Sequence, residues 1–255
     1  MVALDRTWVH IGTHKTGTSA LQRYMRKNLL EFHDRGMRFY APGAHTTPAY
    51  HALPLVAVRS ELTLPIRRRA PDWTLAECLD AAAEVVRDFQ DAEPGTDTFF
   101  SHEGLSLIRQ QSEAEALAGL LGEGHEVHII AVVRDPAEYL NSWRAQLEKM
   151  DLSGSSPFRS SYMYTESDSW LTDYAAMLAP FEAVFGSSNV HVVDYNRELE
   201  ASGSIIPAVL RCAGWERLPA GWRERANVTG ADPQSASRWS RIRGMYRSAR
   251  TAATR

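Results

Sequence analysis

The sequence has few of the features expected of a secreted, membrane-spanning or nucleic-acid-binding protein. Only two of its 255 residues are cysteines, Cys78 and Cys212, which excludes a disulfide framework and a cysteine-based zinc site and fits a reducing compartment. No apolar run is long enough to cross a bilayer, and no apolar leader precedes the first predicted strand. The net charge of −3 implies no general attraction to nucleic acid. We therefore expect a cytoplasmic protein with no membrane or nucleic-acid partner.

Lysine is the second scarce residue. Among 28 basic residues only Lys15, Lys27 and Lys149 are lysines, so a chain that nearly always uses arginine places a lysine at position 15. A compact ammonium on a flexible stem suits a negative charge that moves from one oxygen to another. Lys15 is therefore a candidate catalytic residue.

Apolar segments alternate with amphipathic ones, a pattern that predicts an α/β fold: a doubly wound, mainly parallel sheet with helices on both faces. The expected strands cover residues 7–12, 37–40, 97–101, 126–133 and 189–194. The expected helices cover residues 19–34, 75–89, 113–121, 136–149, 170–185 and 205–213. We expect one domain over residues 1–255, with an arginine-rich tail from about residue 238 that could be flexible. Residues 42–71 form a long irregular stretch, which we expect to be functional or partly helical.

A glycine-bounded loop joins the first strand to the first helix. It reads Gly12-Thr13-His14-Lys15-Thr16-Gly17-Thr18-Ser19. Successive backbone N–H groups and a helix N-terminus favour an anion at such a loop, and the Thr18 and Ser19 hydroxyls can cap the helix. The alternative is a structural turn that binds nothing.

The spacing of this loop argues against an ATP or GTP site. A Walker A loop has the pattern G-x-x-x-x-G-K-[ST], and Gly12 and Gly17 have the required separation. However, Thr18 occupies the position of the Walker lysine, and Lys15 lies inside the loop.

A second pattern follows the most apolar predicted strand. Arg134 comes directly after that strand, and Ser142 lies eight residues further on, in a predicted helix. Arginine offers a planar fork for a phosphate, and a serine hydroxyl can complete the site. The alternative is an ion pair between Arg134 and Asp135, with Ser142 as a surface residue.

Together the two patterns resemble those of PAPS-dependent sulfotransferases, whose 5′-phosphosulfate loop reads K-x-G-[ST]-[ST] and whose 3′-phosphate site pairs an arginine with a serine eight residues later. The resemblance implies in-line transfer of a sulfuryl group from PAPS to a hydroxyl of a saccharide or small-molecule metabolite, with adenosine 3′,5′-bisphosphate (PAP) as product and no metal. The cofactor-binding residues that it implies are His14, Lys15, Thr16, Gly17, Thr18, Ser19, Arg134 and Ser142. Lys15 would stabilise charge on the leaving oxygen.

The general base has two adjacent candidates, Glu103 and His102, both just after the strand over residues 97–101. By the resemblance, many bacterial and polysaccharide-modifying members use a glutamate, whereas the small-molecule cytosolic members use a histidine. His51 and His45 are further alternatives. Because ligands bind beyond the carboxyl ends of parallel strands, we expect the base candidates, Lys15 and Arg134 on one rim of the sheet.

Other features have less specific interpretations. Arg67-Arg68-Arg69 could meet an acidic acceptor or form a solvated face. Aromatic side chains between residues 158 and 170 could cover the acceptor or pack in the core. Two other classes of function remain open: an ATP-dependent P-loop phosphotransferase, and a nucleotide-binding module without catalysis.

Overall fold

A computed structural model describes residues 6–39, 48–62, 74–90, 95–121, 126–150, 152 and 155–223. The strands are β1 (Arg6–His10), β2 (Met37–Phe39), β3 (Asp97–Ser101), β4 (Glu126–Val133) and β5 (Val190–Asp194). The α-helices are α1 (Thr18–Lys27), α2 (Leu29–Asp34), α3 (Pro48–Ala57), α5 (Leu75–Gln90), α6 (Gln111–Leu121), α7 (Pro136–Glu148), α8 (Tyr174–Phe185), α9 (Tyr195–Ser202) and α10 (Ile206–Cys212). Short 3-10 helices are η1 (Glu103–Leu107), η2 (Trp170–Thr172) and η3 (Ser187–Asn189).

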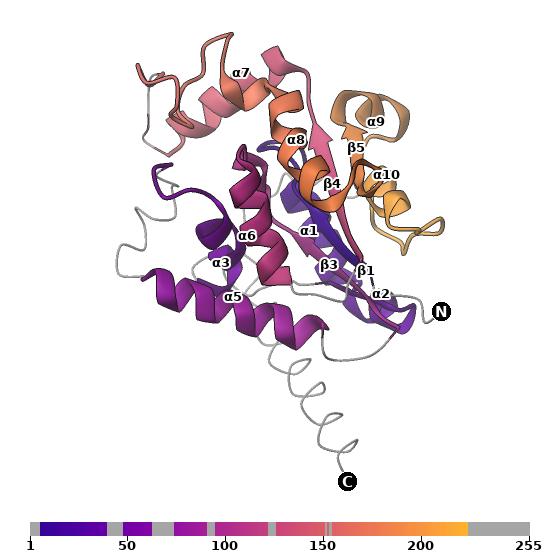
Figure 1. The fold of residues 1–255 in the computed structure, drawn as a ribbon. Helices are drawn as coiled ribbons and strands as arrows, with labels where there is room; N and C mark the ends of the chain where they lie inside the picture. The colour runs from indigo at the N-terminus through magenta and orange to yellow at the C-terminus, as the bar shows by residue number, and fades with distance from the viewer. Residues whose placement is uncertain are drawn as a thin grey trace.

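The five strands form one parallel sheet in the order β2-β3-β1-β4-β5 (Figure 1). His10 pairs with Ser101 of β3 and with Ile130 of β4, and Val133 pairs with Asp194 of β5. All carboxyl ends therefore meet at one edge of the sheet, called the rim below. The predicted doubly wound α/β fold is confirmed.

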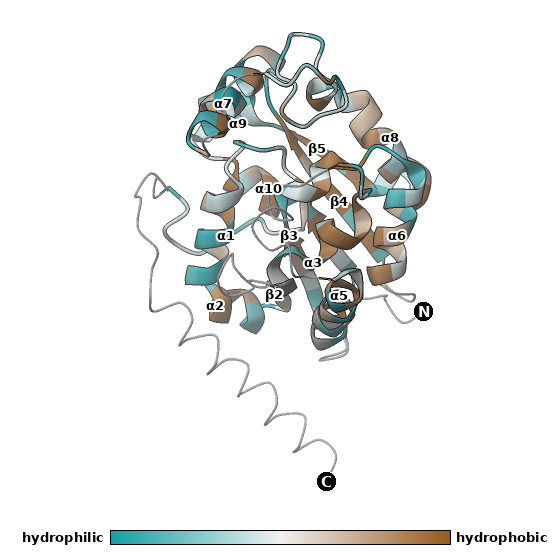
Figure 2. Cartoon of the chain, turned by 90° about the vertical axis from the view of Figure 1, so that its left-hand side faces the viewer, coloured by the Kyte–Doolittle hydropathy of each residue, from teal (hydrophilic) through white to brown (hydrophobic). Residues whose placement is uncertain are grey.

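Alternate residues of each strand enter two separate cores. Val9 and Ile129 belong to the core that contains residues of α3, α5, α6 and α8, whereas Trp8 and Ile130 belong to the core that contains residues of α1, α2 and α10. Figure 2 shows α1 and α2 on one side of the sheet and α5, α6 and α8 on the other. Burial on both faces explains why β4 is an almost continuous apolar run.

The structure divides two predicted helices, the one over residues 19–34 and the one over residues 170–185, where Asp173 separates η2 from α8. Asn28 interrupts the single helix expected over residues 19–34, and its side-chain Nδ2 donates to the carbonyl of Tyr24 at 2.9 Å, which helps to end α1. The irregular stretch 42–71 contains α3, in agreement with the expected partial helicity. The short helix α9 was not predicted, because none of its residues is buried and its sequence lacks an apolar stripe.

The segments after α3 and after η1 are held by one buried carboxylate. Glu113, at the start of α6, accepts backbone N–H groups of Arg59, Arg109 and Gln110 at 2.7–3.0 Å. Its carboxylate also pairs with the Arg59 guanidinium at 3.1 Å. Because these donors come from the segments after α3 and after η1, Glu113 ties both segments to α6.

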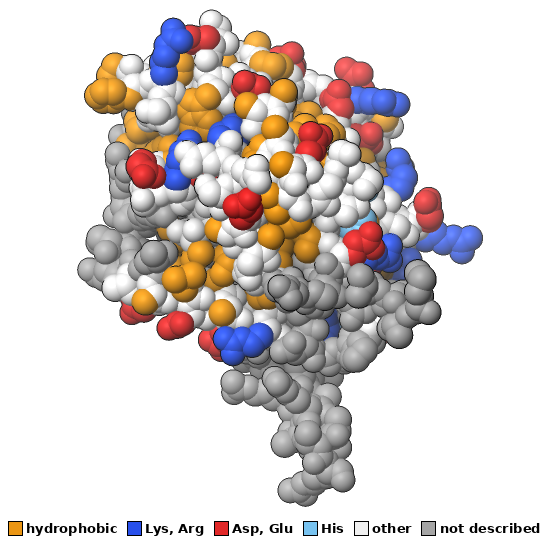
Figure 3. All heavy atoms as spheres, viewed as in Figure 1, with side chains coloured by type: hydrophobic (Ala, Val, Ile, Leu, Met, Phe, Trp, Pro, Cys, Tyr) orange, Lys and Arg blue, Asp and Glu red, His pale blue; other side chains and the backbone are white. Residues whose placement is uncertain are grey.

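Charge and hydropathy add two observations. Acidic and basic side chains are interspersed on the face of the molecule shown in Figure 3. Within the described residues, no helix combines the length and apolar character needed to cross a membrane.

Candidate functional site

The loop between β1 and α1, called the cradle below (residues 12–19), is fastened to β4. The N–H of Thr13 donates to the carbonyl of Val132 at 3.0 Å, and the Thr13 hydroxyl donates to the same oxygen at 3.1 Å. The Thr16 hydroxyl donates to the carbonyl of Thr13 at 2.5 Å and closes the turn. Lys15 adopts a left-handed backbone with φ of 66°, alone among the described non-glycine residues. Such conformations are uncommon and cluster at functional sites.

The cradle presents donors that the protein itself does not use. Across the described ranges, the backbone N–H groups of residues 15–19 have no protein acceptor. Helix α1 begins after Gly17, which supplies no capping side chain, so the expected capping by Thr18 or Ser19 is wrong. Among the residues that the structure describes, the buried Thr18 hydroxyl has no hydrogen-bond partner. A helix N-terminus with unused N–H groups and an unpaired buried hydroxyl fits a bound oxyanion.

Helix α7 carries Ser142, the second residue of the Arg134–Ser142 pattern, and lies next to the cradle. Glu138, Ser142 and Gln146 follow one another at intervals of four, so they share one helical face. Glu138 contacts Arg134 at 3.0 Å, and Gln146 accepts from the Lys15 ammonium at 3.5 Å. Half-buried Ser142 therefore lies on the face between a contact to Arg134 and a contact to Lys15.

The guanidinium of Arg134 lies directly beside the cradle. Its Nη1 is 3.5 Å from the carbonyl oxygen of Lys15, whereas Nε and Nη2 both donate to Oε2 of Glu138. Its Cζ lies 4.9 Å from the ring centre of Tyr195, at the start of α9. The expected proximity of Arg134 and the cradle is therefore present. The alternative ion-pair partner, Asp135, instead caps α7 by accepting from the N–H of Glu138 at 3.0 Å.

The sequence did not single out Glu138 and Asn196, which form a hydrogen-bond network with Arg134. Asn196 donates to Oε2 of Glu138 at 3.0 Å and accepts from the N–H of Asp135 at 3.0 Å. Hydrogen bonds from Asn196 and Arg134 lower the pKa of Glu138, so the carboxylate stays charged. The spacing of four between Arg134 and Glu138 could have predicted their contact, whereas no local pattern indicates Asn196.

The two candidate bases differ in how they are engaged. His102 caps η1: its Nδ1 accepts from the N–H of Gly104 at 3.0 Å, and its Nε2 lies 3.2 Å from Nδ1 of His51. Both ring nitrogens of His102 therefore have partners. Glu103 is half-buried at the start of η1, and its charge acts on the pKa of the cradle residue His14.

His14 is the cradle residue that packs against α7. Its ring centre is 4.5 Å from that of Trp143 on α7. Its Nδ1 is enclosed and has no hydrogen-bond partner in the described segments, although the residue as a whole is partly exposed. Burial lowers the pKa of His14, the Glu103 carboxylate opposes this effect, and Lys15 adds to it. His14 is therefore held neutral next to both Lys15 and Glu103.

The remaining candidates lie on α3, in the loop after α7 or outside the described residues. His51 contacts His102, while His45 and Arg67-Arg68-Arg69 lie outside the described residues, as does the tail from residue 238. Of the loop aromatics, Tyr162 and Tyr164 are buried, whereas Phe158 is 72% exposed. No group of three or more histidine, cysteine or acidic side chains in the described part is placed to hold a metal ion.

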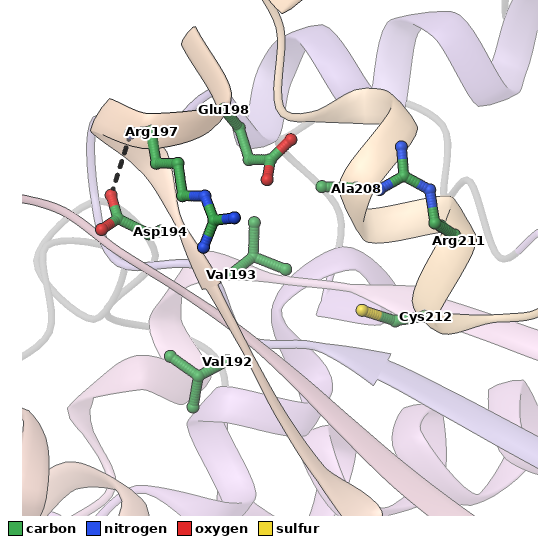
Figure 4. Close-up of a pocket in the computed structure, with 8 residues that line it drawn as sticks. All are labelled: Val192, Val193, Asp194, Arg197, Glu198, Ala208, Arg211 and Cys212. Atoms are coloured by element: carbon green, nitrogen blue, oxygen red, sulfur yellow. Dashed lines mark hydrogen bonds between the residues drawn. The ribbon is translucent and has the colours of Figure 1, made fainter. Parts of the chain in front are cut away.

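A cleft of about 360 Å³ lies beside β5, the last strand in the sheet order, and not at the cradle (Figure 4). It is lined by residues of β5, α9 and α10: Val192, Val193, Asp194, Arg197, Glu198, Ala208, Arg211 and Cys212. None of these residues belongs to the cradle, to α7 or to the turn with Glu103. The cleft is therefore separate from the constellation around Lys15.

Of the comparisons with known proteins, only the one with solved structures found a match, and it concerns the fold. No protein-family model matches the chain, and no curated protein matches its sequence. A crystal structure of a sulfotransferase from Alicyclobacillus acidocaldarius superposes with a TM-score of 0.58 at 14% identity, over 96% of this chain and 93% of that one. A sulfotransferase domain from the curacin biosynthetic pathway gives a TM-score of 0.47 at 10% identity, over 93% and 83% of the two chains. The likeness to the Alicyclobacillus structure shows that the chain has the sulfotransferase fold that its two motifs predicted.

Proposed function

We propose that the protein transfers the sulfuryl group of PAPS to a hydroxyl of a saccharide or small-molecule metabolite. The observation that supports this function best is the 3.5 Å approach of Arg134 Nη1 to the Lys15 carbonyl. Because of this contact the cradle and the Arg134 guanidinium, the two candidate anion sites, are neighbours at one rim. A nucleotide with an anionic group on each side of its ribose requires two such neighbouring sites. The unused N–H groups and the unpaired Thr18 hydroxyl of the cradle fit the 5′ end of that nucleotide.

The residues around the cradle have separate roles in this proposal. The N–H groups of residues 15–19 and the hydroxyls of Thr18 and Ser19 bind the 5′-phosphosulfate, with Thr16 and Gly17 shaping the turn and His14 beside it. Lys15 stabilises the negative charge that develops on the leaving oxygen. Arg134 and Ser142 bind the 3′-phosphate. PAPS supplies the sulfuryl group, and PAP is released.

Glu103 takes the proton of the acceptor hydroxyl in this proposal. Glu103 follows His102, whose N–H donates to the carbonyl of His10 just before the cradle at 3.0 Å, and its charge raises the pKa of the cradle residue His14. His102 is a less suitable base because both of its ring nitrogens already have partners. Its role is to cap η1 and so to fix the residue that follows it.

The proposal is tested by supplying the protein with PAPS labelled at sulfur and a panel of hydroxyl acceptors, in parallel with ATP and Mg²⁺ labelled at the γ-phosphate. We expect label to move to an acceptor from PAPS alone. Transfer from ATP would show a phosphotransferase instead. Tight binding of PAP without turnover of any acceptor would show a nucleotide-binding module.

Replacing Arg134 with alanine is expected to weaken PAP binding about 10- to 100-fold, because hydrogen bonds between charged groups contribute about 1.5–3 kcal/mol. The Kd is measured by isothermal titration calorimetry. Arg197→Ala is the matched control, since Arg197 is exposed on α9 and lines the separate cleft. An unchanged Kd in Arg134→Ala would contradict the assigned 3′-phosphate site.

A further inference from the structure

Three polar residues are buried beneath the cradle, where the proposed reaction gives them no role. His10 ends β1 two residues before the cradle, Gln22 lies on α1 three residues after it, and Ser101 ends β3 immediately before His102 and Glu103. Their exposed fractions are 0%, 3% and 7%, respectively. They therefore lie on β1, α1 and β3, the three elements that flank the cradle or the turn with Glu103.

Hydrogen bonds connect these three residues. Nδ1 of His10 lies 2.9 Å from the Ser101 hydroxyl, and Nε2 of Gln22 donates to the Ser101 carbonyl at 2.8 Å. The N–H of His102 donates to the carbonyl of His10 at 3.0 Å. The peptide group between Ser101 and His102 is consequently held from β1 through its N–H and from α1 through its carbonyl. Glu103 is the next residue along the chain.

The protons of this network can be assigned from its partners. The Ser101 carbonyl can only accept, so the Gln22 atom that faces it is the amide nitrogen. The same nitrogen lies 3.5 Å from the Ser101 hydroxyl oxygen. Among the described contacts, Nδ1 of His10 is the one acceptor for the hydroxyl proton, so we assign the proton to that bond. Burial lowers the pKa of His10 to about 3, so the ring is neutral and its proton resides on Nε2.

The Nε2–H of His10 is directed at the underside of the cradle. A methyl group at Gly12 would lie 2.6 Å from Nε2 and 3.1 Å from the Thr16 hydroxyl oxygen, so Gly12 is required by the imidazole below it. In the described part of the chain, Nε2 has no hydrogen-bond partner. A buried unpaired donor is unfavourable for the free protein, and its dipole places positive potential beneath a loop suited to an anion.

We propose that His10, Gln22 and Ser101 are positioning residues for sulfuryl transfer, which fix the Glu103 turn relative to the Lys15 cradle. The inference rests on the proposed function and concerns the alignment of base and donor rather than nucleotide binding. Loss of this alignment lowers kcat more than it lowers affinity for PAP, because a small displacement of reacting groups slows the chemical step.

The test uses Gln22→Met, which keeps the shape of the side chain but removes the donor to Ser101, and Ser101→Ala, which removes the hydroxyl. Gln111→Met, at the exposed start of α6, is the matched control. Three quantities are measured on the full-length protein: kcat, the Kd for PAP, and hydrogen exchange of the peptide around Glu103 in the free protein. We expect kcat to fall about 10- to 100-fold, the Kd to stay within about threefold, and exchange to rise.

Each outcome decides the inference. A kcat loss with a retained Kd in either variant, together with faster exchange at the Glu103 turn, supports it. An unchanged kcat in both variants, or parallel loss of kcat and PAP affinity, overturns it. If one variant does not fold, the other decides, and failure of both to fold would show a structural role and overturn it. A wild-type protein that transfers no sulfuryl group from PAPS would overturn the proposed function, and the inference with it.

Discussion

Replacing Lys15 with methionine is expected to lower kcat for sulfuryl transfer by about 10²- to 10³-fold, the usual cost of removing one group that stabilises charge in the transition state. Methionine keeps an unbranched stem and removes the ammonium. The loss is expected in kcat rather than in KM for PAPS, because charge accumulates on the leaving oxygen only as the bond to sulfur breaks. Steady-state kinetics at varied PAPS concentration separates the two parameters.

Lys149 offers a matched control for this experiment. It follows α7 and is exposed, and Lys149→Met makes the same chemical change outside the cradle. We expect its kcat to equal that of the wild type. An unchanged kcat in Lys15→Met, or an equal loss in both variants, would remove Lys15 from the catalytic site.

Replacing Glu103 with glutamine is expected to lower kcat by about 10²- to 10⁴-fold, since general base catalysis contributes an effect of this size. Glutamine is nearly the same shape as glutamate but cannot take the acceptor's proton. PAP affinity should change little, because Glu103 is not assigned to the nucleotide. The measurement combines kcat for each variant with the Kd for PAP.

The comparison variant is His102→Asn. Asparagine favours the N-cap position and can accept the Gly104 N–H, so the cap of η1 is retained while the imidazole is lost. We expect a loss of less than about tenfold in kcat, far below the effect assigned to a general base. A larger loss in His102→Asn than in Glu103→Gln would reverse the assignment of the base.

Local sequence was sufficient for the elements with strong apolar patterns. The bounds of β3 and β4 agree with the predicted ranges: β4 is mostly apolar, and β3 places two phenylalanines between polar residues. The proximity of Lys15 and Arg134 was also predictable, since both follow strands of one parallel sheet. The rule that carboxyl ends share an edge needs no knowledge of side-chain contacts.

Contacts between distant segments could not be predicted in the same way. No residue near His102 in the sequence indicates that Nδ1 of His51, on α3, lies 3.2 Å from its Nε2. This contact is one reason why Glu103 is the better candidate base. The hydrogen bond from Gln22 to Ser101 joins residues 79 positions apart. Such contacts depend on how helices pack on the sheet, and periodicity carries no information about that packing.

In the proposed complex one nucleotide occupies two anion sites, the cradle at Lys15 and the guanidinium of Arg134. Calorimetric titration with PAP, 5′-AMP and 3′-AMP measures the contribution of each site. PAP is expected to bind at least about tenfold more tightly than either monophosphate, and Arg134→Ala is expected to remove the advantage of PAP over 5′-AMP. Equal affinities of the wild type for PAP and 5′-AMP would rule out a second anion site at Arg134.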